Sequence, residues 1–544
     1  MSISRRASRL LIIVGVTAAV VTAVLLSIDP LVESAVRNVL TRTQVSGYNV
    51  DFERLHTDVL DRRLRLTGLS ITPSEAMLAN DSVMRFHIEA DTVELHGVAL
   101  RKLVFQKILH VGRITVHSPI VKHSYASRKR SKLEMVEEEL ENKPATDLTG
   151  LSFLRLDTLA VTNGSGTSTD RGGGRADLSV QRLDLFSTGI FVTQTDSGKI
   201  HFSQSRTQLK LDQIQLGMDP FYTLAIGSVR LDLPADTMHM LGIQLIPEVE
   251  PTEYHKLVDR QIELYALKID TAIFHGFDVA RNLDQGAIKA RRVAVAGLEF
   301  NIHRDKSIPM GPFKHQPLPS HIFLGLPIPI SIDTIVGRNA TVSYSERTER
   351  GTPYGTIAFT SIDATMTGLD NTYNYEIPTL RLRGTARLAG HGQAKLDMRL
   401  PMDPERATVE LDAELRNVPF EVLNRMTNNL VKVRATAGRI HRVDMHMKGD
   451  DAGATGTVEM QYEDLRVELN RSVDGAKVLT LLANTVVRKT NMPEDRRYRK
   501  GEFNVQRNRD KGIFNFLWVG MREGMMDVML PTLLTKQIKK QRDK

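Results

Sequence analysis

Apolar and polar residues alternate along much of this chain with the period of two that a half-buried strand requires. The segments Arg63–Ile71, Gln393–Leu400 and Ala407–Leu415 show the pattern most clearly. In Ala407–Leu415 every odd-numbered residue is apolar and every even-numbered residue is polar, so one face of that strand must avoid water. Similar segments recur to about residue 510 between turns that contain Gly, Asn, Asp or Pro. We therefore expect a mainly β body built from antiparallel strands.

Helical periodicity is confined to a few segments. Apolar residues three and four apart predict a short amphipathic helix over residues 31–45 and further helices over Glu421–Leu430 and Ser131–Asn142. The longest helical pattern covers Gly512–Leu530 and is interrupted at Pro531. Its predicted apolar face comprises Phe514, Leu517, Trp518, Met521, Met525, Val528 and Met529. Such a helix, followed by a basic tail, fits an anionic membrane surface or a partner protein, and it equally fits a cap over an open end of the β body.

One short motif recurs along the chain: an apolar residue, Asp, Thr, apolar residues at alternate positions, and Gly. Its copies begin at Ala90, Leu156, Ala235, Ile269 and Ile332. We expect each copy to be one strand with its turn, and its Asp to begin the strand and point to solvent. The alternative is that these acids are catalytic or metal-binding, which requires them to lie within a few ångströms of one another. The acids are Asp91, Asp157, Asp236, Asp270 and Asp333.

The sequence also contains a duplication that is longer than this motif. The segment Ile88–Tyr125 aligns loosely with Leu267–His303, and each is followed by a non-strand insert, Ala126–Gly150 in the first copy and Arg304–His321 in the second. Units that cannot bury their faces singly must stack on one another. The duplication therefore predicts an elongated structure of repeated strands.

The N-terminus carries an uncharged run of nineteen residues, Leu10–Ile28, behind Arg5, Arg6 and Arg9. As a helix this run spans roughly 28 Å, close to the hydrocarbon thickness of a bilayer. A cleaved signal peptide normally has a shorter apolar region followed by small residues at the cleavage site, which are not evident here. We expect an uncleaved anchor with residues 1–9 in the cytoplasm and the bulk of the chain exported. Anchor residues include Leu10, Leu11, Ile12, Ile13, Val24, Leu25 and Leu26.

Composition narrows the classes of protein further. The formal net charge of +8 is small against 72 basic and 64 acidic side chains, and no nucleic-acid-binding motif accompanies the basic residues, so we expect no nucleic-acid partner. The chain has no cysteine, which excludes disulfides, thiolate metal sites and a cysteine nucleophile. An exported chain that folds by packing alone fits a bacterial envelope.

The common sequence motifs of catalytic, nucleotide-binding and metal-binding sites are missing from the sequence. It contains no GxSxG elbow, HExxH, Walker loop, GxGxxG fingerprint or EF-hand loop. The glycine-rich segment Asn163–Gly174 lacks the Lys and following helix of a phosphate-binding loop, so we interpret it as a flexible hairpin loop. The sixteen histidines are scattered, and His87, His96 and His110 are neighbours in sequence only. We expect no catalytic residues, no metal and no cofactor, and hence no enzyme.

Three segments resemble a known family. Asp58–Ile71 and Ile88–Val121, the latter ending in a V-x-S-P-x-V pattern, resemble the opening of AsmA-like proteins, and Ala437–Leu469 is similar to their C-terminal part. The superfamily includes TamB and is similar to the bridge-like lipid transfer proteins. This resemblance implies a long, curved, taco-like antiparallel sheet whose apolar inner face forms a β-groove. It also implies a role in phospholipid transport or outer-membrane homeostasis between the envelope membranes.

Together these features predict an anchored periplasmic protein of the bacterial inner membrane. Its partners are a phospholipid or other acyl lipid, the inner membrane and, through the C-terminal helix, the outer membrane or an envelope protein. Candidates for the groove face are Val93, Leu95, Val409 and Leu411. The expected divisions are 1–9 cytoplasmic, 10–28 transmembrane, 31–45 short helix, 46–375 repeated β-groove, 376–510 C-terminal AsmA-like β domain, and 511–544 amphipathic helix with basic tail.

Three rival interpretations remain open. An adhesin or surface binder would more naturally carry a cleaved signal and exposed aromatic residues, whereas this chain is expected to keep its anchor. A structural or assembly factor of the envelope would have a closed β body without a continuous apolar trough and would use its C-terminal helix to bind a partner. An exported enzyme would need polar residues that converge in one pocket, which the sequence does not indicate.

Overall fold

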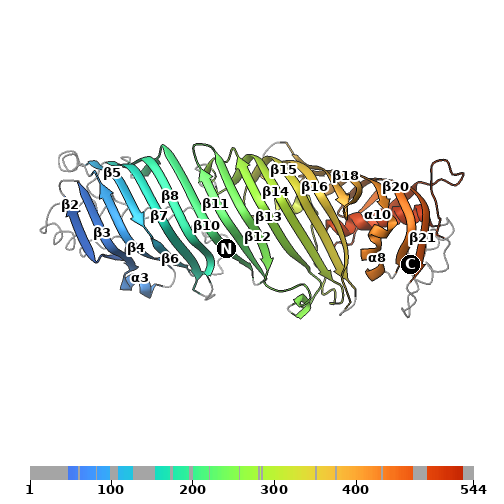
Figure 1. The fold of residues 1–544 in the computed structure, drawn as a ribbon, viewed down its shortest axis with the longest axis horizontal. Coiled ribbons are helices and arrows are strands. Elements are labelled where there is room, and N and C mark those ends of the chain that lie inside the picture. The colour runs from blue at the N-terminus through green and yellow to red at the C-terminus, as the bar shows by residue number, and fades with distance from the viewer. Residues whose placement is uncertain are drawn as a thin grey trace. The chain divides into compact units, whose positions relative to one another are not determined.

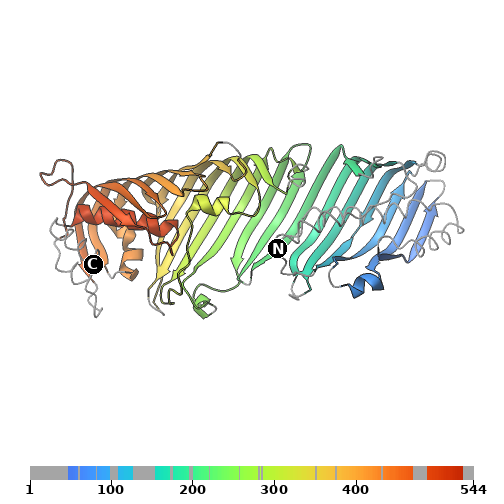
Figure 2. The same ribbon diagram turned by 180° about the vertical axis from the view of Figure 1, so that it is seen from behind.

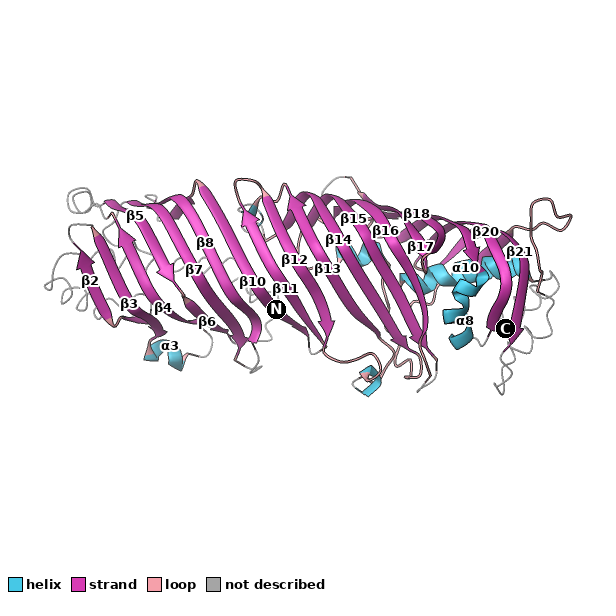
Figure 3. Cartoon of the chain, in the orientation of Figure 1, coloured by secondary structure: helices cyan, strands magenta, loops and turns pink. Residues whose placement is uncertain are grey.

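The computed structural model is built mainly from strands (Figure 3). Strands hold 65% and helices 11% of the residues it describes, which confirms the mainly β prediction. The described residues are 47–58, 62–80, 83–97, 108–125, 153–171, 176–194, 200–219, 221–256, 258–279, 282, 286–348, 352–373, 376–430, 433–469 and 487–530.

Packing divides the chain into two compact units. The first comprises Met1–Gly242 and Asp278–Gly286, and the second comprises Ile243–Phe277 and Ala287–Lys544. The sequence-based divisions at residues 375 and 510 rest on the repeats and the family resemblance, and they remain predictions.

The first unit is a sheet of consecutive strands with one short helix (Figure 1). Its elements are β1 (Tyr48–Asp51), β2 (Arg54–Asp58), β3 (Arg63–Pro73), α3 (Glu75–Ala79), β4 (Arg85–His96), β5 (Ile108–His117), β6 (Ile120–Tyr125), β7 (Phe153–Asp170), β8 (Ala176–Gln194), β9 (Ile200–Ser203), β10 (Arg206–Asp219) and β11 (Tyr222–Asp232). Strand β12 (Thr237–Pro247) crosses the division between the units.

The second unit continues with long strands and carries most of the described helices. Its elements are η1 (Tyr254–Lys256), β13 (Glu263–His275), β14 (Ile288–Asp305), α7 (Pro319–Leu324), β15 (Ile330–Arg347), β16 (Gly355–Asp370), β17 (Thr379–Leu388), β18 (His391–Pro401), β19 (Thr408–Pro419), η2 (Phe420–Leu423), α8 (Asn424–Leu430), β20 (Val433–Asp450), β21 (Gly453–Leu469), β22 (Gly501–Gln506) and α10 (Ile513–Met529). The helix predicted over Glu421–Leu430 is therefore present as η2 followed by α8.

Most strand pairs in the described part of the chain are antiparallel, but three of them are parallel, which corrects the expectation of a purely antiparallel sheet. Strands β5 and β6 both pair in parallel with β7, and β14 pairs in parallel with β15. A parallel neighbour requires the chain to cross back along the sheet before it pairs. The two inserts noted in the sequence fall at these positions, between β6 and β7 and between β14 and β15. The second insert ends within α7.

The recurrent Asp–Thr motif marks a kink inside a strand, not the start of one. Asp91 lies well within β4 and faces Gly68 of β3, which has a φ of 63°. Buried apolar side chains occupy even-numbered positions of β3 before Gly68 and odd-numbered positions after it. Because a residue with positive φ shifts the alternation by one position, the apolar residues on both sides of the kink share one face.

Other copies of the motif pair in the same way. Asp157 lies opposite Gly189, Asp270 opposite Gly297 and Asp333 opposite Gly368, and these glycines have φ values of 62°, 65° and 75°. The expected solvent exposure is confirmed for Asp91, Asp236, Asp270 and Asp333, whereas Asp157 is half-buried. The copy at Asp236 differs, because this residue lies in the turn before β12.

The glycine-rich segment is largely strand, which overturns its interpretation as a flexible loop. Residues 163–170 continue β7 and pair in parallel with β6. The two strands approach closely here, since a Cβ on Gly164 would lie 3.0 Å from the Pro119 ring and one on Gly166 would lie 3.3 Å from the Val121 carbonyl. The glycines therefore permit close strand packing and do not signal a turn.

Helix α10 is confirmed, but a different face of it contacts the sheet. The buried positions are Phe516, Gly520, Gly524 and Val528, while Phe514 and Trp518 are 48% and 47% exposed. A Cβ on Gly524 would overlap Val458, so glycine lets the helix backbone lie directly on β21 and β22. The predicted face counted only large apolar residues, and it therefore missed two glycines that make the contact. Of the remaining predicted positions, Leu517, Met521, Met525 and Met529 flank the packing face.

The N-terminal predictions concern residues outside the described ranges. The anchor Leu10–Ile28 and the helices over residues 31–45 and 131–142 all lie outside them. Among the helices that the structure does describe, none is long and apolar enough to cross a bilayer.

Candidate functional site

Strands β8, β10 and β11 carry an unbroken set of apolar side chains on one face. Register pairs Leu211 of β10 with Leu183 of β8 and with Val229 of β11, and the neighbouring pairs follow the same rule. Four apolar rows cross the three strands: Leu178–Leu216–Leu224, Val180–Ile214–Ile226, Leu183–Leu211–Val229 and Leu185–Leu209–Leu231. The kink at Gln213 (φ 53°), opposite Gly227, keeps the rows on both sides of it on one face.

These rows are only partly covered by protein. Ile214 and Val229 are 9% and 8% exposed, Leu178 is 36% exposed, and the other members of the rows are half-buried. In the described part of the chain the helices pack mainly elsewhere: α3 on β3, α7 on β18, α8 on β15, β16 and β20, and α10 on β21 and β22. The apolar face of β8, β10 and β11 is thus a surface on which another apolar body can lie. We call it the β8–β11 apolar face.

A similar arrangement begins in the second unit. Leu267 of β13 pairs with Phe300 of β14, which pairs with Val342 of β15 and, through it, with Phe359 of β16. Phe359 is 37% exposed although it is a large aromatic residue. We call this face of β13 to β16 the β13–β16 apolar face.

The residues proposed from sequence for the groove lie on the apolar face but inside packed cores. Val93 and Leu95 are 1% and 0% exposed in the core of the first unit. Val409 and Leu411 are 0% and 4% exposed in the core of the second unit, which also contains Phe516 of α10. Their contacts are with other protein side chains. The partly exposed apolar residues lie on the two faces named above. The sequence pattern did not distinguish these residues from the apolar residues packed in the cores.

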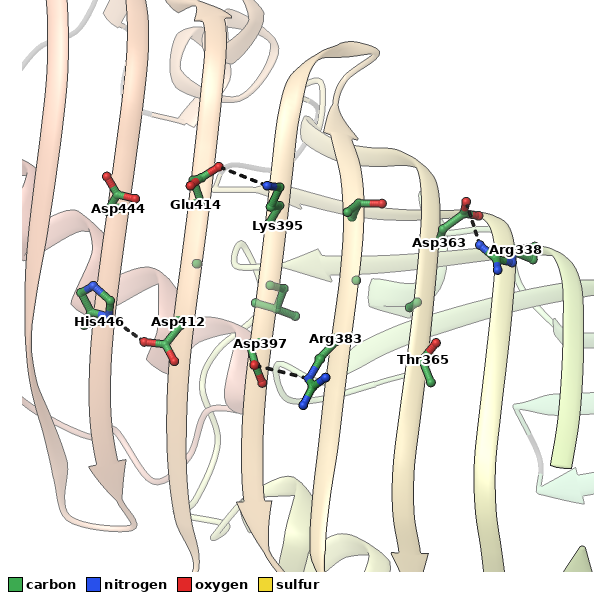
Figure 4. Close-up of a pocket in the computed structure, with 15 residues that line it drawn as sticks. Arg338, Asp363, Thr365, Arg383, Lys395, Asp397, Asp412, Glu414, Asp444 and His446 are labelled. Carbon is green, nitrogen blue, oxygen red and sulfur yellow. Dashed lines mark hydrogen bonds and ion pairs between the residues drawn. The ribbon is translucent and has the colours of Figure 1, made fainter. Parts of the chain in front are cut away.

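The opposite face of the second unit is a lattice of ion pairs across neighbouring strands (Figure 4). His446 contacts Asp412 at 2.6 Å, Arg338 contacts Asp363 at 3.2 Å, and Arg383 contacts Asp397 at 3.5 Å. These side chains surround a shallow depression of about 610 Å³ over β15 to β20.

The electrostatics of this depression fit a structural role. Hydrogen bonds from the Arg381 guanidinium hold the pKa of Asp397 below its ordinary value, and the Arg416 guanidinium does the same for the pKa of Glu414. The backbone N–H of Asn339 is the main cause of the lowered pKa of Asp363. Carboxylates held ionised by such partners cannot serve as general acids near neutral pH. Each strand is instead tied to its neighbour by opposite charges.

A row of buried ions lies at one end of the β13–β16 apolar face. Arg304 contacts Glu263 at 3.2 Å and Lys306 contacts Glu346 at 2.5 Å. The Tyr344 hydroxyl donates to Glu346 at 2.6 Å, and burial together with that carboxylate raises the pKa of Tyr344. Pairing of this kind is what permits charged side chains to be buried there.

Histidine and acidic residues do not gather into a metal site in the part of the chain that the structure describes. His110 lies 3.0 Å from Asp157 and His87 lies 2.7 Å from Glu89, so the two are in separate pairs. Four acids of the recurrent motif likewise lie on different strands, each opposite its own glycine, and Asp236 lies in the turn before β12.

The apolar rows were partly accessible from sequence. The alternation of Leu209, Leu211, Ile214 and Leu216 contains one irregular step, at Asp212–Gln213, which in the structure is the kink. A search for apolar alternation that tolerates one phase shift would have found them. Comparison with known proteins adds no assignment, because no family model and no curated protein matches this chain.

Proposed function

We propose that the β8–β11 apolar face binds the acyl chains of lipids and that the protein contributes to lipid transport or outer-membrane homeostasis in a bacterial envelope. The observation that carries this proposal is the set of four apolar rows that lie side by side across three strands, partly exposed, while the helices that the structure describes pack mainly on other strands. Large apolar surfaces that remain exposed normally mark a binding site.

The energetics suit an acyl chain. Each methylene that leaves water for this surface contributes about 0.8 kcal/mol, while a polar headgroup beyond the edge of the strands keeps its hydration. The rows are chemically alike, with Leu, Ile or Val at every position. Because no row binds an acyl chain much more tightly than the next, a bound acyl chain can move along the face without meeting a strongly preferred position.

The cellular setting is part of the same proposal. The uncharged run Leu10–Ile28 behind three arginines supports an inner-membrane anchor with a cytoplasmic N-terminus and a periplasmic body. The resemblance to AsmA-like proteins supports phospholipid as the ligand class.

Site-specific photocrosslinking in cells tests the acyl-chain site. A photoreactive amino acid replaces Leu216 on the apolar face or, as the matched control, its neighbour Gln215, which is exposed on the opposite face. The full-length protein is irradiated in cells and lipid adducts are identified by mass spectrometry. We expect lipid adducts at position 216 and background levels at position 215, because only the first side chain points to the bound acyl chain.

Equal labelling at both positions, or none at position 216 in a folded protein, would overturn the proposal. Variant folding is checked by the unfolding midpoint, which should match that of the unmodified chain for both positions.

A structural factor of the envelope is the second candidate. It is favoured by the apolar face of β17 to β21, which is packed in a core that includes Phe420, Phe516 and Val528. A protein whose apolar faces are all used in this way would show no lipid adduct at Leu216, so the same experiment separates the two functions.

A further inference from the structure

The crossover between β14 and β15 meets the start of α10 at a junction within the second unit. The Gln316 N–H donates to the Arg509 carbonyl at 2.7 Å, and the Lys314 N–H donates to the Asp510 carboxylate at 2.9 Å. The Lys511 ammonium lies 3.5 Å from the Met310 sulfur. Figure 2 shows α7 of this crossover, in yellow, and α10, in red, in front of the strands.

Large apolar side chains are exposed around this junction. Phe313 is 68% exposed, Phe514 48%, Trp518 47% and Met310 42%. Phe514 and Trp518 are about one helical turn apart on α10, and Lys511 lies two residues before the helix begins at Ile513. These four side chains, together with Lys314, Arg509 and Lys511, form what we call the junction patch.

The surroundings of the patch carry an excess of positive charge. Asp451 is engaged by Arg507, Arg509 and His315, and Asp510 accepts the backbone N–H of Lys314. Among the described residues neither Lys314 nor Lys511 forms an ion pair. Burial, reinforced by repulsion from Arg304 and Lys306, lowers the pKa of Lys511 to about 8. A nearby anion would relieve that repulsion.

We propose that the junction patch docks on the surface of an anionic bilayer. Exposed Trp and Phe flanked by lysine and arginine are typical of segments that lie at the membrane interface, where the rings enter the headgroup region and the cations meet lipid phosphates. This contact is separate from acyl-chain binding on the β8–β11 apolar face, since it uses different residues in the other unit.

Trp518 reports directly on this contact because it is the only tryptophan of the chain. The full-length protein is held in phosphatidylcholine nanodiscs and mixed with vesicles whose acyl chains carry bromine, which quenches tryptophan on contact. With brominated phosphatidylglycerol vesicles we expect Trp518 emission to move to shorter wavelength and to lose about half its intensity. Brominated phosphatidylcholine should have little effect, because the lysines then lack an anionic partner.

Two variants test the contact while keeping Trp518, the fluorescent probe. The double change Phe313→Ser and Phe514→Ser should weaken binding to the phosphatidylglycerol vesicles by about tenfold or more, since it removes two aromatic contacts. The control Leu78→Ser alters a residue of α3 that is 52% exposed, and it should leave the quenching unchanged. An unquenched Trp518 with phosphatidylglycerol, or equal quenching by both vesicles, would overturn the proposal. Neither result affects crosslinking at Leu216, so the two proposals fail independently.

Discussion

At the scale of single residues, this chain depends on pairs of an acid and a glycine that face each other across two strands. Gly297 has a φ of 65°, and a Cβ at this position would overlap the carboxylate of Asp270. The pair lets both strands change their side-chain phase at one point, which keeps Ile269 and Leu298 in line with the apolar residues beyond the kink. The acid therefore faces the kink glycine on the solvent-exposed side of the sheet, and its position can be explained without a catalytic role.

Replacing this glycine should destabilise the protein. For Gly297→Ala we expect a loss of roughly 1–2 kcal/mol from the positive φ alone, with a further loss from the overlap with Asp270. The measurement is the shift in the urea unfolding midpoint of the full-length chain. The double variant Gly297→Ala with Asp270→Ala should recover part of the overlap loss, because it removes the carboxylate but keeps the residue 270 Cβ 2.9 Å from the new Cβ.

The matched control is Gly512→Ala. Gly512 is the N-cap of α10 with a φ of −71°, and a Cβ there would meet nothing within 4 Å, so we expect a cost of no more than about 1 kcal/mol, from the poorer capping by Ala. If Gly297→Ala cost no more than this control, the kink would not require glycine.

At the scale of elements, α10 shows how small residues decide which face of a helix is buried. Gly520 and Gly524 bring the helix backbone against Phe503 of β22 and Val458 of β21. The bulky side chains at Phe514 and Trp518 are left exposed on another side. The helix therefore covers the last strands of the second unit while it presents aromatic residues to solvent.

Enlarging the contact face should detach the helix. Gly524→Val forces new methyl groups into Val458, and overpacking of this kind typically costs about 1–3 kcal/mol. We expect faster tryptic cleavage after Lys511 and Arg522, measured by limited proteolysis and mass spectrometry. Trp518→Ala, at a position that is 47% exposed, should change the cleavage rate little without vesicles present. Similar cleavage of the two variants would place the helix contact elsewhere.

At the scale of the whole molecule, both compact units present a partly exposed apolar face on long strands. The proposed function requires each of them to accept acyl chains, because a lipid that moves along the protein must find a similar surface in both. The polar face of the second unit is tied by ion pairs between neighbouring strands and offers no comparable surface.

The second unit should therefore also be labelled by lipid. A photoreactive residue at Leu267, in the β13–β16 apolar face, should give lipid adducts, and one at its neighbour Lys268, on the other face, should not. The readout is the ratio of adducts at the two positions. Labelling at Leu216 without labelling at Leu267 would confine acyl-chain binding to the first unit and exclude movement along both.

The sequence by itself determined the mainly β class, the position of several strands, the helix at Glu421–Leu430 and the insert between β14 and β15. These features depend on local periodicity, and a period of two or of 3.6 residues can be recognised without knowing what lies across from it. The alternation in Ala407–Leu415 is a clear case, since Ala407, Val409 and Leu411 are all buried.

Only the tertiary structure decided which strands pair in parallel, which face of α10 is buried and where the apolar face remains partly exposed. Each of these depends on groups that are distant in sequence. Gly524 is a contact residue only because Val458 lies against it, and the glycines of β7 matter only because Pro119 and Val121 lie close to them. Val409 is covered because residues of α10 and η2 pack in the same core. The pattern of apolar residues along one strand does not show what covers that strand in the folded protein. A position buried by protein therefore cannot be distinguished from one open to a ligand until the fold is known.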